Sequence, residues 1–156
     1  VGHSLPSEPE GGKKMQVKDV MTKRVIRIDP EESAGVAARL LSRYNLGALP
    51  VCRSDGRLCG MVTDRDIVLR CVAAELDPER TKVRQVMTGH VVTVPAQATL
   101  EEAAAQMSRE QIRRLPVEEG GRLCGMVTLG DLACTKGCAM EAAEAFSDIC
   151  TNVTRR

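Results

Sequence analysis

The sequence predicts a mixed α/β protein of the α+β kind, built from two similar units, and two observations lead to this prediction. First, the stretch Arg57–Thr63 reads RLCGMVT and returns unchanged at Arg122–Thr128. Second, an acidic residue follows each copy three positions later, at Asp66 or Asp131. An apolar run that ends at a threonine before a helical pattern is typical of a strand, a turn and a helix start. The duplication indicates that this junction occurs twice in the fold.

Composition narrows the class of protein. With 156 residues and 43% hydrophobic content, the chain can bury a core in one compact domain or in two small ones. Its 22 basic and 21 acidic side chains give a net charge of +1, so no overall field favours nucleic acid or an anionic membrane. No apolar run approaches the roughly 20 residues of a membrane span, and no segment near the N-terminus resembles a signal peptide. We therefore expect a cytoplasmic protein without nucleic-acid or membrane partners.

The repeat divides the chain into segments. Residues 1–14 contain almost nothing apolar, which predicts a disordered tail or a remnant that precedes the natural start. The two units are expected at residues 15–80 and 81–137. Residues 138–156 are expected to form a C-terminal helical extension.

Each unit is expected to begin with a helical turn that ends at a threonine. The two turns are Val17–Thr22 and Val83–Thr88. A first strand follows each turn and is closed by a proline, which cannot continue a strand ladder. These strands are Val25–Ile28 and Val91–Val94.

An amphipathic helix comes next in each unit. Ser33 and Thr99 are the equivalent N-caps, and Thr99 forms a capping-box pattern with Glu102. Apolar residues then recur at helical spacing until the helices end near Leu46 and Ile112.

A hairpin and a final helix complete each unit. A second strand leads through a polar turn into the RLCGMVT strand, and the final helix starts directly after it. The second strands are expected at Ala48–Val51 and Arg114–Val117, and the final helices over Asp64–Glu75 and from Thr128 past Gly137 to Ile149.

A single unit of this kind is too small to bury both faces of its sheet. We therefore expect the two units to pack with pseudo-two-fold symmetry and to place the Thr-x-x-Asp junctions in related clefts. Each junction combines a hydroxyl, a carboxylate and free helix-terminal N–H groups. These groups suit a ligand that carries sugar hydroxyls and phosphate.

The ordered set of motifs resembles a tandem pair of cystathionine β-synthase (CBS) domains. The resemblance covers Val17 to about Ala133 and depends on the Met-Thr start, the strand before proline, the Leu-Pro-Val strand and Gly-Met-Val-Thr-x-x-Asp, all present twice. Within the family, the chain is most similar to small stand-alone bacterial proteins. The resemblance implies a Bateman module that binds adenosine derivatives in clefts between the repeats and regulates another, unknown protein.

The family pattern implies roles for the motif residues. Asp66 and Asp131 would accept hydrogen bonds from ribose hydroxyls, and Thr63 and Thr128 would donate to phosphate or ribose oxygens. The adenine would lie between aliphatic side chains. Asp131 and Thr128 are expected to face Thr22, Val25, Ile26, Leu46 and Gly47, whereas Asp66 and Thr63 are expected to face Thr88, Val91, Val92, Ile112 and Arg113.

Two of these roles have an alternative. Asp66 and Asp131 could instead cap the final helices by accepting first-turn N–H bonds. Arg65 could hold a phosphate or be a solvated first-turn residue, and the second copy has no charge at its position. The two sites are therefore expected to differ.

We expect a regulatory module that senses AMP, ADP or ATP, with NAD and S-adenosylmethionine also compatible with ribose recognition. No catalytic set, P-loop or metal site is expected, so the protein is not expected to be an enzyme. One alternative is a ligand-free dimeric scaffold that docks a partner. Another is a redox or metal sensor that uses Cys134, Cys138 and Cys150.

A homodimer is also expected. The final helix of the first unit has an apolar side that one small sheet cannot cover, and CBS pairs resemble each other in dimerising through these helices. The apolar side consists of Ile67, Val68, Cys71 and Val72.

Overall fold

The computed structural model describes residues 14–135 and 137–154, and these residues form two compact units. Unit 1 contains the described residues up to Val25, then Val92–Glu119 and the chain from Cys124 onward. Unit 2 contains Ile26–Val91 and the hairpin tip Gly120–Leu123. Each unit therefore combines most of one sequence repeat with the opening segment of the other repeat.

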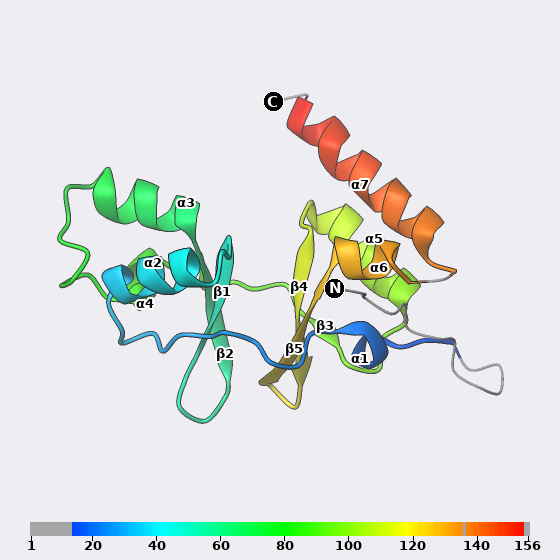
Figure 1. Ribbon diagram of the computed structural model, residues 1–156, viewed down its shortest axis with the longest axis horizontal. Helices are drawn as coiled ribbons and strands as arrows, with labels where there is room; N and C mark the ends of the chain where they lie inside the picture. The colour runs from blue at the N-terminus through cyan, green and yellow to red at the C-terminus, as the bar shows by residue number, and fades with distance from the viewer. Residues whose placement is uncertain (1–13, 136, 155–156) are drawn as a thin grey trace. The chain divides into compact units, whose positions relative to one another are not determined.

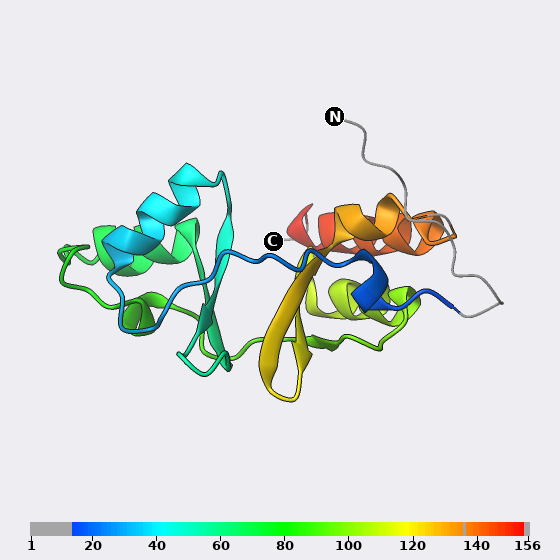
Figure 2. The ribbon, with the colours of Figure 1, turned by 60° about the horizontal axis from the view of Figure 1, so that its bottom comes forward.

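Unit 2 is a β-hairpin covered on one side by helices. Its strands are antiparallel, and Ile28 adds a parallel bridge to Val51 at the edge. The helices lie on one side of the hairpin in both views (Figures 1 and 2). The elements are α2 (Ala34–Arg43), β1 (Ala48–Cys52), β2 (Leu58–Thr63), α3 (Asp64–Ile67), the π-helical η1 (Val68–Val72) and α4 (Val83–Val86).

Unit 1 has the same plan with an additional helix. Its sheet has the order β3-β4-β5, and β3 runs parallel to β4. The C-terminal helix α7 packs against α5 and α6, and Figure 2 shows it in red alongside them. The elements are α1 (Val17–Val20), β3 (Val94–Pro95), α5 (Leu100–Glu110), β4 (Arg114–Glu119), β5 (Arg122–Thr128), α6 (Leu129–Ala133) and α7 (Ala139–Thr154).

Each unit has its own aliphatic core. Leu49 and Val62 are fully buried in unit 2, as are Leu115 and Leu132 in unit 1. Full burial of one such side chain stabilises a fold by about 1.5–3 kcal/mol. The predicted apolar faces of the amphipathic helices are therefore confirmed by which side chains lie inside.

The Met-Thr segments cross the repeated strands at their glycines. Thr22 and Met126 exchange two backbone hydrogen bonds, of 2.8 and 3.0 Å. A Cβ on Gly125 would lie 2.9 Å from the Thr22 carbonyl oxygen. In unit 2, a Cβ on Gly60 would lie 2.9 Å from the Thr88 carbonyl oxygen. The glycine of RLCGMVT is thus explained by the close approach of another backbone.

Several predicted elements are confirmed. Both Val17–Val20 and Val83–Val86 are helical turns. Ser33 caps α2 by accepting a hydrogen bond from the Val36 N–H, and Thr99 and Glu102 form a reciprocal capping box at α5. Local hydrogen-bonding chemistry therefore starts the two long amphipathic helices at the expected residues.

Four predicted elements are shorter than expected. The first strands are reduced to the bridge at Ile28 and the two residues of β3, because the preceding residues have no ladder partner. The helix after Thr63 changes to π-helical geometry at Val68 and ends at Val72, not at Glu75. The helix after Thr128 stops at Ala133, and the chain turns through Gly137 at φ 90° before α7 begins.

Within the described part of the chain, none of the helices is both long enough and apolar enough to cross a membrane.

Candidate functional site

Each Thr-x-x-Asp motif forms a reciprocal capping box at a strand-to-helix junction. In unit 2, the Asp66 N–H donates to Thr63 Oγ1 at 3.0 Å, and the Thr63 N–H donates to Asp66 Oδ2 at 3.0 Å. In unit 1, the bonds between Thr128 and Asp131 are 3.1 and 2.8 Å long. The motif therefore caps the helix. Threonine is the N-cap, and the aspartate carboxylate accepts a hydrogen bond from the backbone N–H of that threonine. One carboxylate oxygen of each aspartate, Oδ1, takes no part in the box.

In unit 2, the second oxygen of Asp66 faces a cation. Arg70 Nη1 lies 3.6 Å from Asp66 Oδ1. The same nitrogen donates to the backbone oxygens of Val86 and Met87 at 2.9 and 3.1 Å, and lies 3.4 Å from Thr88 Oγ1. Arg70 thereby connects Asp66 to Thr88, one of its expected neighbours. Sequence reasoning missed Arg70, although its i, i+4 spacing from Asp66 was a usable signal.

In unit 1, the equivalent position holds Thr135 instead of arginine. Thr135 is 2% exposed and its hydroxyl donates to the Asp131 backbone oxygen at 2.8 Å. Among the described residues, none forms an ion pair with the Asp131 carboxylate. Oδ1 of Asp131 is thus a carboxylate acceptor without a competing cation, unlike Oδ1 of Asp66.

The structure brings some expected site residues together. Thr22 and Val25 belong to unit 1 with Thr128 and Asp131, and the Thr22–Met126 bridge places Thr22 beside β5. Thr88 and Val91 belong to unit 2 with Thr63 and Asp66, and Thr88 bridges to Met61. The remaining expected neighbours belong to the unit opposite their motif, and their part in the sites stays a prediction; they are Ile26, Leu46, Gly47, Val92, Ile112 and Arg113.

Arg65, expected near phosphate, is exposed on the first turn of α3. Its backbone N–H donates to Asp64 Oδ1 at 2.8 Å, and its guanidinium forms no ion pair within the described residues. A role in phosphate binding therefore stays a prediction for Arg65.

A groove of about 470 Å³ opens in unit 1 beside the second motif. One wall contains Thr128 and Gly130, and the other contains Ala143 and Phe146 of α7. Arg113 lies at the groove, with its guanidinium 5.7 Å from the centre of the Phe146 ring. Sequence reasoning did not assign α7 to any site, because small residues at helical spacing usually indicate packing alone.

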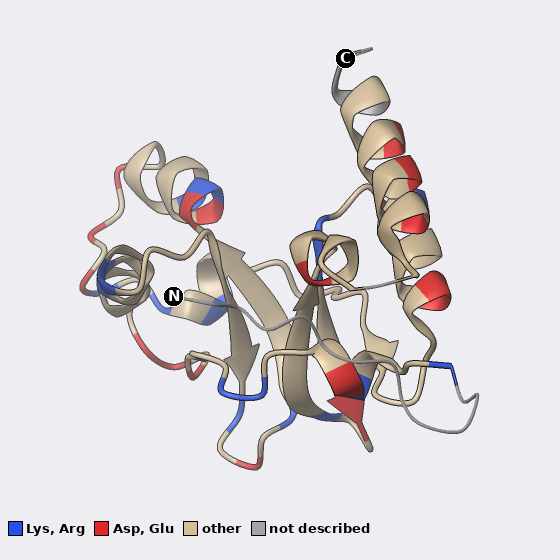
Figure 3. Ribbon diagram, turned by 45° about the vertical axis from the view of Figure 1, so that its right-hand side comes forward, with Lys and Arg blue, Asp and Glu red and all other residues tan. Residues whose placement is uncertain are grey.

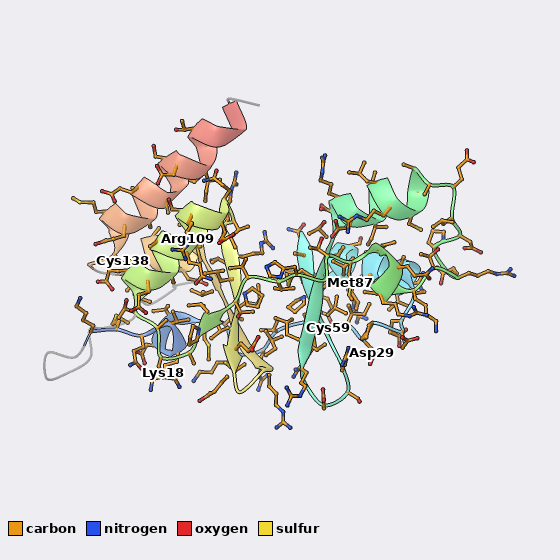
Figure 4. The ribbon with its side chains drawn as sticks, turned by 180° about the vertical axis from the view of Figure 1, so that it is seen from behind. Lys18, Asp29, Cys59, Met87, Arg109 and Cys138 are labelled. Carbon is orange, nitrogen blue, oxygen red and sulfur yellow. The ribbon has the colours of Figure 1, made fainter. Side chains whose placement is uncertain are left out.

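The cysteines give little support to thiol chemistry. Cys134 is exposed, whereas Cys138 is buried. Burial, together with the charges of Glu141 and Glu101, raises the pKa of the Cys138 thiol to about 11. A thiol of this kind is protonated at neutral pH and is a poor nucleophile. Figure 4 labels Cys138, and also Cys59 on β2, where burial likewise raises the pKa.

Metal ligands do not gather in the described part of the chain. Within it, no group of three or more His, Cys, Asp or Glu side chains is arranged to hold a metal ion. Acidic side chains recur along α7, as the red segments in Figure 3 show.

The duplicated α+β units and the two capped junctions define a protein with an internal repeat and a ligand-type motif in each copy. The family model described as "CBS domain" matches residues 17–72 and 83–134. The chain therefore belongs to the CBS domain family, and its two copies make it a CBS domain pair. A CBS pair is a regulatory ligand-binding module.

Similar proteins include several that this chain matches over almost their whole length. CBS domain-containing protein YhcV of Bacillus subtilis is 41% identical over 133 residues, which cover 85% of this chain and 94% of that protein. A crystal structure of Hypoxic Response Protein I with two coordinated zinc ions has 37% identity and a TM-score of 0.70, covering 76% of this chain and 97% of that one. The CBS domain pair of protein MJ0100, solved with 5-methylthioadenosine and S-adenosyl-L-methionine, has 28% identity and a TM-score of 0.67, covering 78% and 94%.

Proposed function

We propose that this protein is a regulatory sensor, and not an enzyme, that binds an adenosine derivative through its Thr-x-x-Asp motifs. The observation that carries the proposal is the Oδ1 atom of Asp131, a carboxylate oxygen beside a helix start that the capping box leaves available. A carboxylate can accept hydrogen bonds from neighbouring ribose hydroxyls. The complex of the MJ0100 CBS pair with two adenosine compounds supports the ligand class.

The capping box holds the Asp131 carboxylate in one orientation. Asp131 is fixed by its bond to the Thr128 N–H at 2.8 Å, so little side-chain entropy is lost when a ligand binds. The two motifs bind with different strength in this proposal, because Asp66 shares its Oδ1 with Arg70 and Asp131 does not.

The regulated output is a change in assembly or in contact with another protein. Two of the residues expected in a dimer contact, Val68 and Val72, are exposed, whereas Ile67 and Cys71 are buried in the core of unit 2. The expected contact surface is therefore corrected to the exposed side of η1. We include homodimerisation through this side in the proposal, with the identity of any regulated partner left to experiment.

The test starts from the ligand itself. Mass spectrometry of small molecules released from the purified protein should detect an adenosine compound, and thermal shift with AMP, ADP, ATP, NAD and S-adenosylmethionine should rank the candidates. Binding at a hundredfold excess over Kd raises stability by about 2.7 kcal/mol, so a real ligand gives a clear shift. If none of the five compounds shifts the transition and nothing is released, the ligand-free scaffold replaces the sensor.

A further inference from the structure

The turns of the two β-hairpins meet within unit 2, and each turn brings an arginine to the contact. Arg57 and Arg122, the first residues of the two RLCGMVT copies, face one another in an antiparallel bridge. Beside this bridge, the Leu123 N–H donates to the Gly56 carbonyl oxygen at 3.1 Å. The tip Gly120–Leu123 belongs to unit 2, so the contact lies inside one compact unit. Like charges placed directly opposite one another across a β-bridge are destabilising.

Each of these two arginines lies over the glycine of the other turn, and a third arginine joins them. A Cβ on Gly121 would lie 2.8 Å from Arg57 Nη1. A Cβ on Gly56 would lie 3.9 Å from Arg122 Cδ and 4.0 Å from Arg27 Nη1. All three arginines are exposed. We call Arg27, Arg57 and Arg122 the arginine cluster.

The acidic side chains at the two turns neutralise the arginine cluster only in part. Asp55 Oδ2 lies 3.6 Å from Arg57 Nε, in a pair that is half exposed and therefore weak. The other two members of the cluster form no ion pair within the described residues. Glu119, beside the second turn, accepts a hydrogen bond from Gln97 Nε2 at 3.1 Å. Figure 3 shows basic segments in blue along the β1–β2 turn. The cluster thus keeps an excess of positive charge.

The chemistry of the arginine cluster fits an oligophosphate group. A guanidinium presents its N–H donors in a planar fork that matches the oxygens of phosphate. A chain of phosphates offers several anionic groups to several forks, whereas a single carboxylate occupies one fork. Single-stranded nucleic acid fits less well, because its bases stack on aromatic side chains. The only tyrosine and the only phenylalanine, Tyr44 and Phe146, lie at the end of α2 and in α7, and the chain has no tryptophan.

We propose that the arginine cluster binds an oligophosphate group, either free or carried by a nucleotide. The phosphates offset the repulsion between the arginines that the bridge holds face to face. Arg57 comes from the first sequence repeat and Arg122 from the second, so the ligand contacts both repeats at once. The inference goes beyond the proposed sensor, because the cluster shares no residue with the Thr-x-x-Asp motifs and needs no ribose.

Calorimetry with inorganic tripolyphosphate, which has no ribose, tests the site on the full chain. Wild type should bind it. Arg27→Gln and Arg122→Gln should each raise the Kd at least about tenfold, because each removes a guanidinium that makes charged hydrogen bonds to phosphate. Asp55→Asn should lower the Kd, because it frees Arg57 from a competing carboxylate. Circular dichroism checks that the variants fold.

Arg80→Gln is the matched control. Arg80 is an exposed arginine of unit 2 that lies 3.7 Å from Asp77 and outside the cluster, so its loss should leave the Kd unchanged. A wild type that does not bind tripolyphosphate would overturn the inference. An equal loss in Arg80→Gln and in the cluster variants would also overturn it, since general charge screening would then explain the binding.

Asp131→Asn separates this inference from the proposed function. It should leave tripolyphosphate binding unchanged, whereas a loss there would place the phosphates at the motif and overturn the inference. ATP titrated into the same variant distinguishes the two sources of the group: a Kd close to that of tripolyphosphate assigns a nucleotide, and no ATP binding assigns a free phosphate chain. A single-stranded RNA that binds more tightly than tripolyphosphate, with the same losses in Arg27→Gln and Arg122→Gln, would overturn the inference in favour of nucleic acid.

Discussion

Arg70 Nη1 lies 3.6 Å from Asp66 Oδ1, and within the described residues this ion pair has no counterpart at Asp131, where Thr135 stands in place of the arginine. The two Thr-x-x-Asp motifs share their threonine and aspartate but differ in electrostatics. One carboxylate oxygen is shared with a cation, and the other is not. The first two predictions follow from this difference.

Arg70→Ala should lower the free energy of unfolding by about 1–3 kcal/mol, because charged hydrogen bonds to the Val86 and Met87 carbonyl oxygens are lost. The ion pair with Asp66 is long, at 3.6 Å, and Arg70 is half exposed, so it should add little to this loss. Urea unfolding measures the effect. Arg65→Ala, on the same helix but without a side-chain hydrogen bond or ion pair to a described residue, should change stability by less than about 0.5 kcal/mol. Equal losses in the two variants would show that the Arg70 contacts do not stabilise unit 2.

Asp131→Asn should lower the affinity for the adenosine compound about 10- to 150-fold while the protein stays folded. The asparagine carbonyl can still accept the Thr128 N–H, but an amide donor replaces the acceptor Oδ1. Calorimetry measures the affinity. Glu102→Gln is the matched control, because it alters the carboxylate of the capping box at α5, away from the motif. Unchanged affinity in Asp131→Asn would show that the aspartate only caps the helix and does not bind the ligand.

Gly60→Ala should destabilise the protein by about 1–3 kcal/mol, because its methyl group would meet the Thr88 carbonyl oxygen at 2.9 Å. Gly125→Ala should have a similar effect through the Thr22 carbonyl oxygen. Gly89→Ala is the control, since a Cβ there meets nothing within 4 Å. Chemical denaturation of the three variants compares them directly. A loss at Gly89 as large as that at Gly60 would contradict the crossing-backbone explanation.

Cys138 should make the protein less stable at alkaline pH. Its pKa is raised from 9.0 to about 11 in the folded state, so between these values the unfolded chain ionises first. The stability contributed by the neutral, buried thiol is present below pH 9 and is lost as the pH rises to 11. Urea unfolding at several pH values should show a steeper fall for wild type than for Cys138→Ala. Parallel profiles would contradict the raised pKa, and fast modification of Cys138 by a maleimide at neutral pH would contradict its burial.

The elements of this fold were predictable where local chemistry decides them. Ser33 and Thr99 start helices because their hydroxyls accept N–H bonds within the same turn. The hairpin strands follow from apolar runs separated by polar turns, and the internal repeat revealed both copies of the ligand motif. The candidate aspartates were predicted from the repeat and the family resemblance, and the capping box that each of them forms involves only neighbouring residues.

Other features depend on residues far apart in the sequence, and only the tertiary structure decided them. Whether Val25–Ile28 forms a strand depends on the presence of a ladder partner, and only Ile28 has one. The Thr22 segment packs on the second repeat because Gly125 lets its backbone approach. The groove arises because α7 returns along α6 after the turn at Gly137. Local sequence sets backbone preferences and caps, whereas ladder partners, close backbone approaches and grooves require two segments to meet in space, and that meeting is a property of the folded chain.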